Sequence, residues 1–431
     1  MAMRDRFLPA LLFSLAFIAS PAGAQDLLIQ AGRVLDVETG RMLEGRDILV
    51  RDGRIVSIAP PTKGVDPRVR VLDWSALTVV PGLMDMHTHL ADEGPYGDPA
   101  TPLRSNAARD AFIGARNARA TLQAGFTTVR DVGVYRGFAD VQLRDAINAG
   151  LVPGPRMFVA GTYVTVSGGG GEITGLPAGT ELPAIFRRGV ADSEAEVRQR
   201  VNEILDAGAD FIKLIATGAV LADGTEPGQS EYTEAEIRAA VEEAGRRGSF
   251  VAAHAHGAEG IKRAVRAGVR SIEHGSLMDD EAIALMKQHG TFLVADIYNG
   301  DYIDTVGRRD GWSAEILRKN LDTTEAQREG FRKAVAAGVN IAYGTDSGVY
   351  PHGDNARQFA YMVRYGMTPL QAIRAATLES ARLLRKEKEL GSITPGKLAD
   401  LVALACDPLA DIACLQQVRG VVKGGVPVAR D

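Results

Sequence analysis

The chain has 431 residues, of which 24% are charged and 45% hydrophobic, and its formal net charge is -5 at pH 7. This is ordinary globular composition, and the length is sufficient for one large domain and a small one. The slightly acidic balance and the lack of a basic run give no support to nucleic-acid binding.

The N-terminus has the pattern of a secretory signal peptide. Two arginines occur within residues 1–6, an apolar run follows over residues 7–19, and Ala22-Gly23-Ala24 supplies a small-residue cleavage site. The apolar run is short for a bilayer span, so an uncleaved anchor is the less favoured alternative. We therefore predict removal of residues 1–24 and a periplasmic or secreted protein with no stable membrane span.

Both ends of the mature chain contain short β-strand patterns. Residues 27–31 and 54–58 near the N-terminus, and 399–404 near the C-terminus, are β-prone runs bounded by turn residues. The simplest account is that the two ends meet. We predict one small β-sandwich made by residues 25–80 together with 386–431.

The chain has two cysteines, Cys406 and Cys414, both near the C-terminus. Export would place them in an oxidising environment, where a disulfide can persist. Two cysteines alone do not make a disulfide framework, so a pair of free buried thiols fits the sequence at least as well.

Residues 81–385 alternate between strand and helix patterns. Capping boxes at Ser193–Glu196 and Thr233–Glu236 mark helix starts, and glycines such as Gly338 precede strands as helix C-caps do. Eight alternating β and α units predict a closed (β/α)8 TIM barrel, with a doubly wound open sheet as the alternative. The eight candidate strands are 83–87, 127–131, 157–161, 211–215, 250–254, 271–274, 291–295 and 340–345.

Candidate metal ligands fall where several predicted strands end. His87 and His89 end the first strand, and alternate residues of a strand point to the same side, which suits two imidazoles on one metal ion. A His-x-His pair alone is weak evidence. His254, His274 and Asp346 also end predicted strands, however, and active sites of such barrels lie at this end.

Lys213 lies among apolar residues in the fourth predicted strand. Lysine is almost never fully buried unless it is paired, and its ammonium would repel neighbouring metal ions. Carbon dioxide adds to a neutral amine and gives a carboxylate that can bridge two cations. A carbamylated Lys213 would therefore remove both difficulties.

Together these motifs resemble the metal-dependent amidohydrolase superfamily. Within it, the chain is similar to the Xaa-Pro dipeptidase and imidazolonepropionase-like branch, which includes prolidase-type carboxypeptidases and ochratoxin-hydrolysing amidases. The resemblance covers essentially all of the mature chain. It rests on residues 81–89, Lys213, 251–257, 272–275, 344–346 and 391–401.

The resemblance implies two Zn²⁺ ions bridged by N6-carboxylated Lys213, although relatives can use other divalent metals. It also implies that Asp346 accepts the proton of the attacking water and delivers it to the leaving amine. The implied ligands are His87, His89 and Asp346 for the buried ion and His254 and His274 for the outer ion, with Lys213 shared.

One segment departs from the family pattern. Relatives often show Gly-Gly-His-Gly after the third strand, whereas residues 167–171 here have Gly170 in place of the histidine. We expect a change in substrate contacts there, with a merely flexible loop as the alternative. His256 is a further candidate for substrate contact, and Tyr232 and His352 are weaker ones.

We therefore predict an exported binuclear zinc enzyme that hydrolyses amide or peptide bonds. Its substrates would be dipeptides or N-acyl amino acids, with release of the C-terminal residue, and ochratoxin-type amides are included. Hydrolysis of a cyclic amide is the alternative. A non-catalytic binding protein is disfavoured because all six ligands are present. The resemblance also implies a homo-oligomer.

Overall fold

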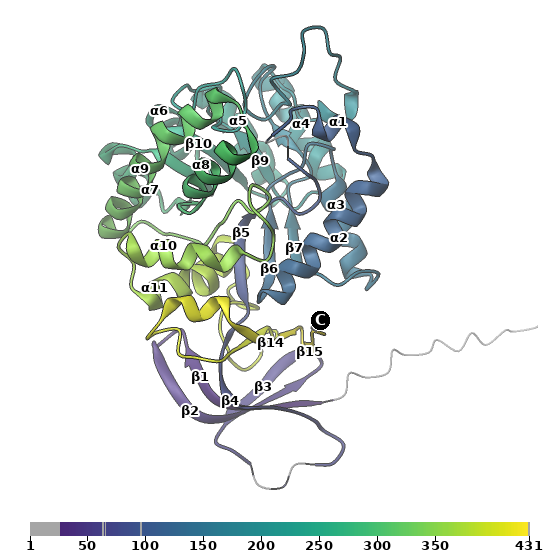
Figure 1. Ribbon diagram of the computed structural model, residues 1–431, viewed down its shortest axis with the longest axis vertical. Helices are drawn as coiled ribbons and strands as arrows, with labels where there is room; N and C mark the ends of the chain where they lie inside the picture. Colours follow the sequence, from purple (N-terminus) through teal and green to yellow (C-terminus); the bar gives the residue numbers. More distant parts are fainter. Residues whose placement is uncertain (1–25, 63, 65, 95–96, 430–431) are drawn as a thin grey trace, which may run out of the picture.

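The computed structural model describes residues 26–62, 64, 66–94 and 97–429. Its helices and strands form two parts, a barrel above and a β-sheet below in the view of Figure 1. The predicted signal peptide, residues 1–24, lies outside the described residues.

The upper part is the predicted (β/α)8 barrel. Its strands form two parallel ladders, one in the order β5-β6-β7 and one in the order β12-β11-β10-β9-β8. The strands are β5 Leu83–Thr88, β6 Phe126–Asp131, β7 Arg156–Val159, β8 Tyr163–Val164, β9 Ile212–Ile215, β10 Val251–Gly257, β11 Ser271–Leu277 and β12 Phe292–Val294.

The third barrel strand is broken into β7 and β8. The first piece pairs with β6 and the second with β9. Gly161 lies between them at φ +76°, in the left-handed region that favours glycine. This bend passes the chain from one ladder to the other.

The eighth barrel strand is reduced to isolated bridges. Within and just after the predicted run 340–345, Ile341 bridges to β12 and Ser347 bridges to β5. Asp346 N donates to His87 O at 2.8 Å. The segment thus bridges to both ladders and carries Asp346 to the end of β5.

Helices cover the outside of the barrel (Figure 1). Two sequence signals are confirmed, because Thr233 and Glu236 form the capping box of α5, and Gly338 ends α9 at φ +72°. In the described part of the chain, no helix has both the length and the apolar character needed to cross a bilayer. The helices are α1 Thr101–Arg104, α2 Ala107–Gln123, α3 Ala139–Asn148, α4 Glu194–Asp206, α5 Glu234–Arg246, α6 Ala258–Ala267, α7 Asp280–His289, α8 Asn299–Asp310, α9 Ala314–Ala337, α10 Gln358–Arg364, α11 Pro369–Arg374 and α12 Ser380–Leu383.

The lower part is one seven-stranded sheet in the order β15-β14-β13-β4-β1-β2-β3. Both chain ends meet in this sheet, as expected. The sheet also folds on itself, because Ile55 N of β3 donates to Lys397 O, close to β13, at 2.9 Å. Trp74 and Leu401 belong to the apolar core inside this fold. The strands are β1 Leu27–Asp36, β2 Arg41–Arg51, β3 Arg54–Ala59, β4 Arg70–Pro81, β13 Leu401–Leu404, β14 Val418–Lys423 and β15 Val426–Pro427.

The two cysteines form a disulfide. Cys406 and Cys414 lie in the connection between β13 and β14, and their Cα atoms are 5.8 Å apart. The side chain of Cys414 is fully buried against the barrel core. The structure therefore favours the disulfide over the free thiols that the sequence left open.

Gly344 allows the eighth strand to pass close to its neighbours. A Cβ there would lie 2.2 Å from Val294 Cγ1 and 3.1 Å from His87 Cβ. We expect Gly344→Ala to lower the free energy of unfolding by about 1–3 kcal/mol through overpacking, measured by denaturant unfolding. Gly245→Ala is the control, because nothing lies within 4 Å of its Cβ position in α5. Equal stabilities of the two variants would contradict this account.

Candidate metal centre

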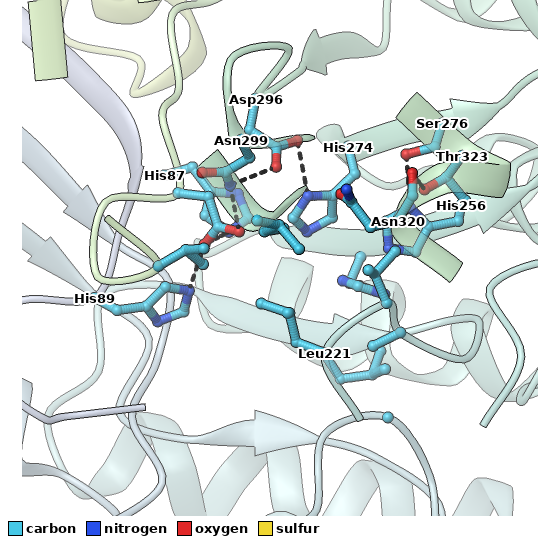
Figure 2. A pocket seen from close by; sticks show the side chains of 18 of the residues that line it. His87, His89, Leu221, His256, His274, Ser276, Asp296, Asn299, Asn320 and Thr323 are labelled. Carbon is cyan, nitrogen blue, oxygen red and sulfur yellow. Dashed lines mark hydrogen bonds and ion pairs between the residues drawn. The ribbon is translucent and has the colours of Figure 1, made fainter. Parts of the chain in front are cut away.

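One cavity opens at the carboxyl ends of the barrel strands, and Figure 2 shows side chains that line it. The sequence predicted a cluster of polar side chains at this face, and the structure brings that cluster together. The six predicted metal ligands all line the cavity, and so do two of the predicted substrate contacts: His87, His89, Lys213, His254, His274 and Asp346, with His256 and Gly170.

The first group of donors is His87, His89 and Asp346. Asp346 Oδ1 lies 3.2 Å from His89 Nε2 and 3.5 Å from His87 Nε2. The Nδ1 atoms of both rings face other acceptors, Glu273 Oε2 at 2.9 Å and Gly133 O at 2.8 Å. Such partners orient a ring so that its other nitrogen is available to a metal ion. Two imidazoles and a carboxylate that could bind one metal ion therefore lie together on one side of the cavity.

The second group contains His254, His256 and His274. One ring nitrogen from each lies within 4.8 Å of the others, and all three side chains are buried. His274 Nδ1 lies 2.9 Å from Asp296 Oδ1. A third group, formed by His274, Asp296 and Asp346, links this side of the cavity to the first. The donors thus form one continuous cluster.

The backbone is strained at two of these donors. His274 has φ +67° and Asp346 has φ +56°, a region that non-glycine residues seldom adopt. Each such conformation costs about 1–3 kcal/mol and persists only where the surrounding structure enforces it. The fold thus holds both side chains at this cluster despite an unfavourable local conformation.

Lys213 lines the same cavity from β9, with 2% of its surface exposed. Burial lowers the pKa of its amine to about 8, because the charged form is poorly solvated there. The neutral amine is the form to which carbon dioxide adds. The environment of Lys213 is therefore suited to carbamylation.

Three charged residues of the site were not singled out in the sequence. Arg130 is fully buried, and its Nη2 donates to Glu273 at 2.7 Å, while Glu273 in turn holds His87. Burial by itself would raise the pKa of Asp296. The interaction with His274 outweighs the effect of burial and holds that pKa well below its usual range. Asp296 directly follows the predicted seventh strand, so its position at a strand end was an available signal.

The four predicted substrate contacts divide into two pairs. His256 and Gly170 line the cavity, and a Cβ on Gly170 would lie 3.0 Å from Ala219 N, so a larger residue would crowd that loop. Tyr232 and His352 do not line it, which differs from the prediction. Tyr232 is buried in the apolar core and donates to Ala191 O at 2.8 Å, and His352 Nε2 lies 3.1 Å from His89 O, behind the site.

The imidazole and carboxylate donors fit a divalent metal such as Zn²⁺. A barrel with these donors at the carboxyl ends of its strands has the features of a metal-dependent enzyme, because active sites of such barrels lie at that end. Residues 78–428 match the amidohydrolase family, and the chain belongs to that family.

Several relatives are similar over nearly their whole length. Ochratoxinase of Aspergillus niger is 34% identical over 429 residues, which cover 95% of this chain and 88% of that protein. A solved Xaa-Pro dipeptidase with methionine bound in its active site is 39% identical, with a TM-score of 0.88, and the match covers 94% of this chain and 99% of that one.

Two further proteins are also similar to this chain. A solved prolidase in complex with N-methylphosphonate-L-proline has a TM-score of 0.87 and 34% identity, covering 94% of this chain and 100% of that one. Imidazolonepropionase of Symbiobacterium thermophilum is 27% identical, covering 89% of this chain and 90% of that protein. The chain is accordingly a hydrolase of carbon–nitrogen bonds.

Replacing Asp296 should weaken metal binding. In Asp296→Asn the carboxylate that holds His274 Nδ1 becomes a neutral amide, so the ring loses its ionic partner. We expect a loss of zinc affinity of about 10- to 100-fold, measured by competition with a chelator. Asp310→Asn is the control, because Asp310 pairs with Arg309 on the exposed end of α8. Unchanged affinity in Asp296→Asn would refute this role.

Proposed function

We propose that the mature protein is an exported binuclear zinc amidohydrolase. It hydrolyses the amide or peptide bond of dipeptides or N-acyl amino acids, ochratoxin-type amides included, and releases the C-terminal residue. The observation that carries this proposal is the convergence of four histidines and Asp346 around the buried Lys213 in one cavity. The similarity to ochratoxinase and to Xaa-Pro dipeptidase and prolidase structures supports the choice of substrates.

The donors divide between two metal positions. Bound zinc would polarise the scissile carbonyl and make water a better nucleophile near neutral pH. His87, His89 and Asp346 would hold one ion, His254 and His274 the other, and carboxylated Lys213 both.

In the proposed mechanism, Asp346 moves the proton. Its carboxylate takes the proton of the attacking water and passes it to the leaving amine, which must be protonated to depart. Asn299 Nδ2 lies 3.1 Å from Asp346 Oδ2 and 2.8 Å from Asp296 Oδ2. The amide of Asn299 therefore fixes the direction of the carboxylate that handles the proton.

Export is part of the proposal. The pattern of residues 1–24 supports it, and the Cys406–Cys414 disulfide agrees with it, because disulfides persist mainly in oxidising compartments. Assembly into a homo-oligomer, which the family resemblance implies, belongs to the proposal as well.

Hydrolysis of a cyclic amide is the second candidate. The similarity to an imidazolonepropionase over 89% of the chain favours it. Both candidates use the same metal ligands and differ only in the substrate that fits the cavity.

A substrate screen separates the two candidates. The zinc-loaded mature protein would be tested on dipeptides, N-acyl amino acids, an aryl amide of phenylalanine and several cyclic amides. We expect release of the C-terminal amino acid from linear substrates, detected by amino-acid analysis. Turnover of cyclic amides alone would establish the second candidate, and no turnover of any amide would refute both.

The extent of carbamylation of Lys213 should depend on pH through the pKa of its amine. Since carbon dioxide adds only to the neutral amine, whose share rises through a pKa of about 8, metal-free protein should carry more carbamate at pH 9 than at pH 7. Carbon-13 NMR with labelled bicarbonate, at fixed dissolved carbon dioxide, measures the adduct. The signal should vanish in Lys213→Ala and persist in Lys333→Ala, whose amine is half-exposed and paired with Asp280. A signal that survives in Lys213→Ala would refute the assignment.

A further inference from the structure

The cavity has two chemically different ends. In Figure 2, His89 lies at one end, His274 lies between, and a neutral polar group lies at the other. This polar group consists of His256, Ser276, Asn320 and Thr323. A substrate whose scissile bond lies at the metal ligands would extend toward both ends.

The end beside His89 combines a carboxylate with two aromatic rings. Asp92, Tyr135 and Tyr163 all line the cavity. Asp92 follows β5 and its Oδ2 accepts from Tyr135 N at 2.7 Å, which fixes the carboxylate. The rings of Tyr135 and Tyr163 are 5.5 Å apart and edge-on, and the Tyr163 ring is 6.2 Å from that of His89.

Asp92 is a buried carboxylate that lines the cavity near His89. It is 9% exposed, and burial raises the pKa of its carboxyl to about 6, so it is mostly ionised at neutral pH. Among the residues described by the structure, no lysine or arginine forms an ion pair with it, and Lys213 supplies the only such side chain in the cavity lining. Buried charges are normally paired, and aromatic rings attract cations, so a carboxylate with two tyrosine rings nearby suits an ammonium group.

The opposite end offers hydrogen bonds without a net negative charge. His256 Nδ1 lies 2.7 Å from Ser276 Oγ. Asn320 and Thr323 lie one turn apart on α9 and face the same space (Figure 2). Imidazole and amide N–H groups suit a carboxylate. The cavity therefore matches a ligand that is positive at one end and negative at the other.

We propose that Asp92, with the rings of Tyr135 and Tyr163, binds the α-ammonium of a dipeptide whose carboxylate lies at the His256 end. This inference rests on the proposed function and narrows its substrate class. Of the two linear substrates, the dipeptide carries the ammonium, whereas an N-acyl amino acid offers Asp92 no positive group. Asp92 is thus a specificity-determining residue.

Matched substrates test the proposal. L-Alanyl dipeptides ending in phenylalanine, methionine or proline are compared with their N-acetyl derivatives, which keep the scissile bond and lose the ammonium. We expect kcat/KM of the wild type to favour the free dipeptides by about 10- to 100-fold. In Asp92→Asn this preference should disappear, through a rise in KM for the free dipeptides alone.

The neighbouring acid provides the control. Glu93 pairs with Arg109 at 3.0 Å and does not line the cavity, so Glu93→Gln removes one negative charge nearby and should keep the preference. An equal loss on both kinds of substrate in Asp92→Asn would overturn the proposal, because it would indicate a merely structural role. A wild type that prefers N-acetyl substrates would overturn it as well.

Binding separates this proposal from the proposed function. Calorimetric titration of Asp346→Asn, which lacks the proton carrier, reports affinity without turnover; the zinc concentration is raised until the variant is saturated, because Asp346 is also a proposed metal ligand. The free dipeptides should bind at least tenfold more tightly than their N-acetyl derivatives, and Asp92→Asn in the same background should abolish the difference. Equal affinities would overturn the ammonium site even if amides are hydrolysed. If no amide is hydrolysed, the proposed function fails and the affinities still decide this site.

Discussion

The structure depends on the pairing of charged groups that are buried together at one end of the barrel. Removing an ionisable group from water is costly unless a partner compensates for it. Arg130 is fully buried and bonds to Glu273, which bonds to His87, and Asp296 serves His274 in the same way. These chains of partners begin inside the barrel and end at the candidate metal ligands, so the geometry of the site depends on the packing of the core.

Much of the candidate site could be predicted from the sequence, because the carboxyl ends of all the barrel strands lie at the same face of the barrel. His87 and His254 were found by their place at the end of apolar runs, with no knowledge of their neighbours. Glu273 and Asp296 were not singled out because their roles come from contacts across the barrel, between residues far apart in the chain. Tyr232 was misplaced because position on a loop does not say whether an aromatic ring faces the cavity or the core.

Prediction of the fold from the sequence was limited in the same way, because local patterns do not report contacts between distant residues. Alternating strand and helix patterns indicated the barrel, and capping residues such as Thr233 set helix starts. The eighth strand was predicted over 340–345 from its apolar pattern, yet only isolated bridges form there. Two donors with positive φ, His274 and Asp346, lie at or next to irregular backbone. Local pattern cannot anticipate such strain, because the surrounding tertiary structure imposes it.

The lower sheet ties the first described strands of the chain to the last. β4 pairs with β1 on one side and with β13 on the other, and β13 begins more than three hundred residues later in the chain. Until the ribosome has delivered that segment, one edge of β4 has no strand to bond, and open edges invite pairing with other chains. β4 also leads directly into β5, the strand that carries His87. An incomplete nascent chain is therefore left with an exposed sheet edge, and its protection from aggregation must come from elsewhere until synthesis ends.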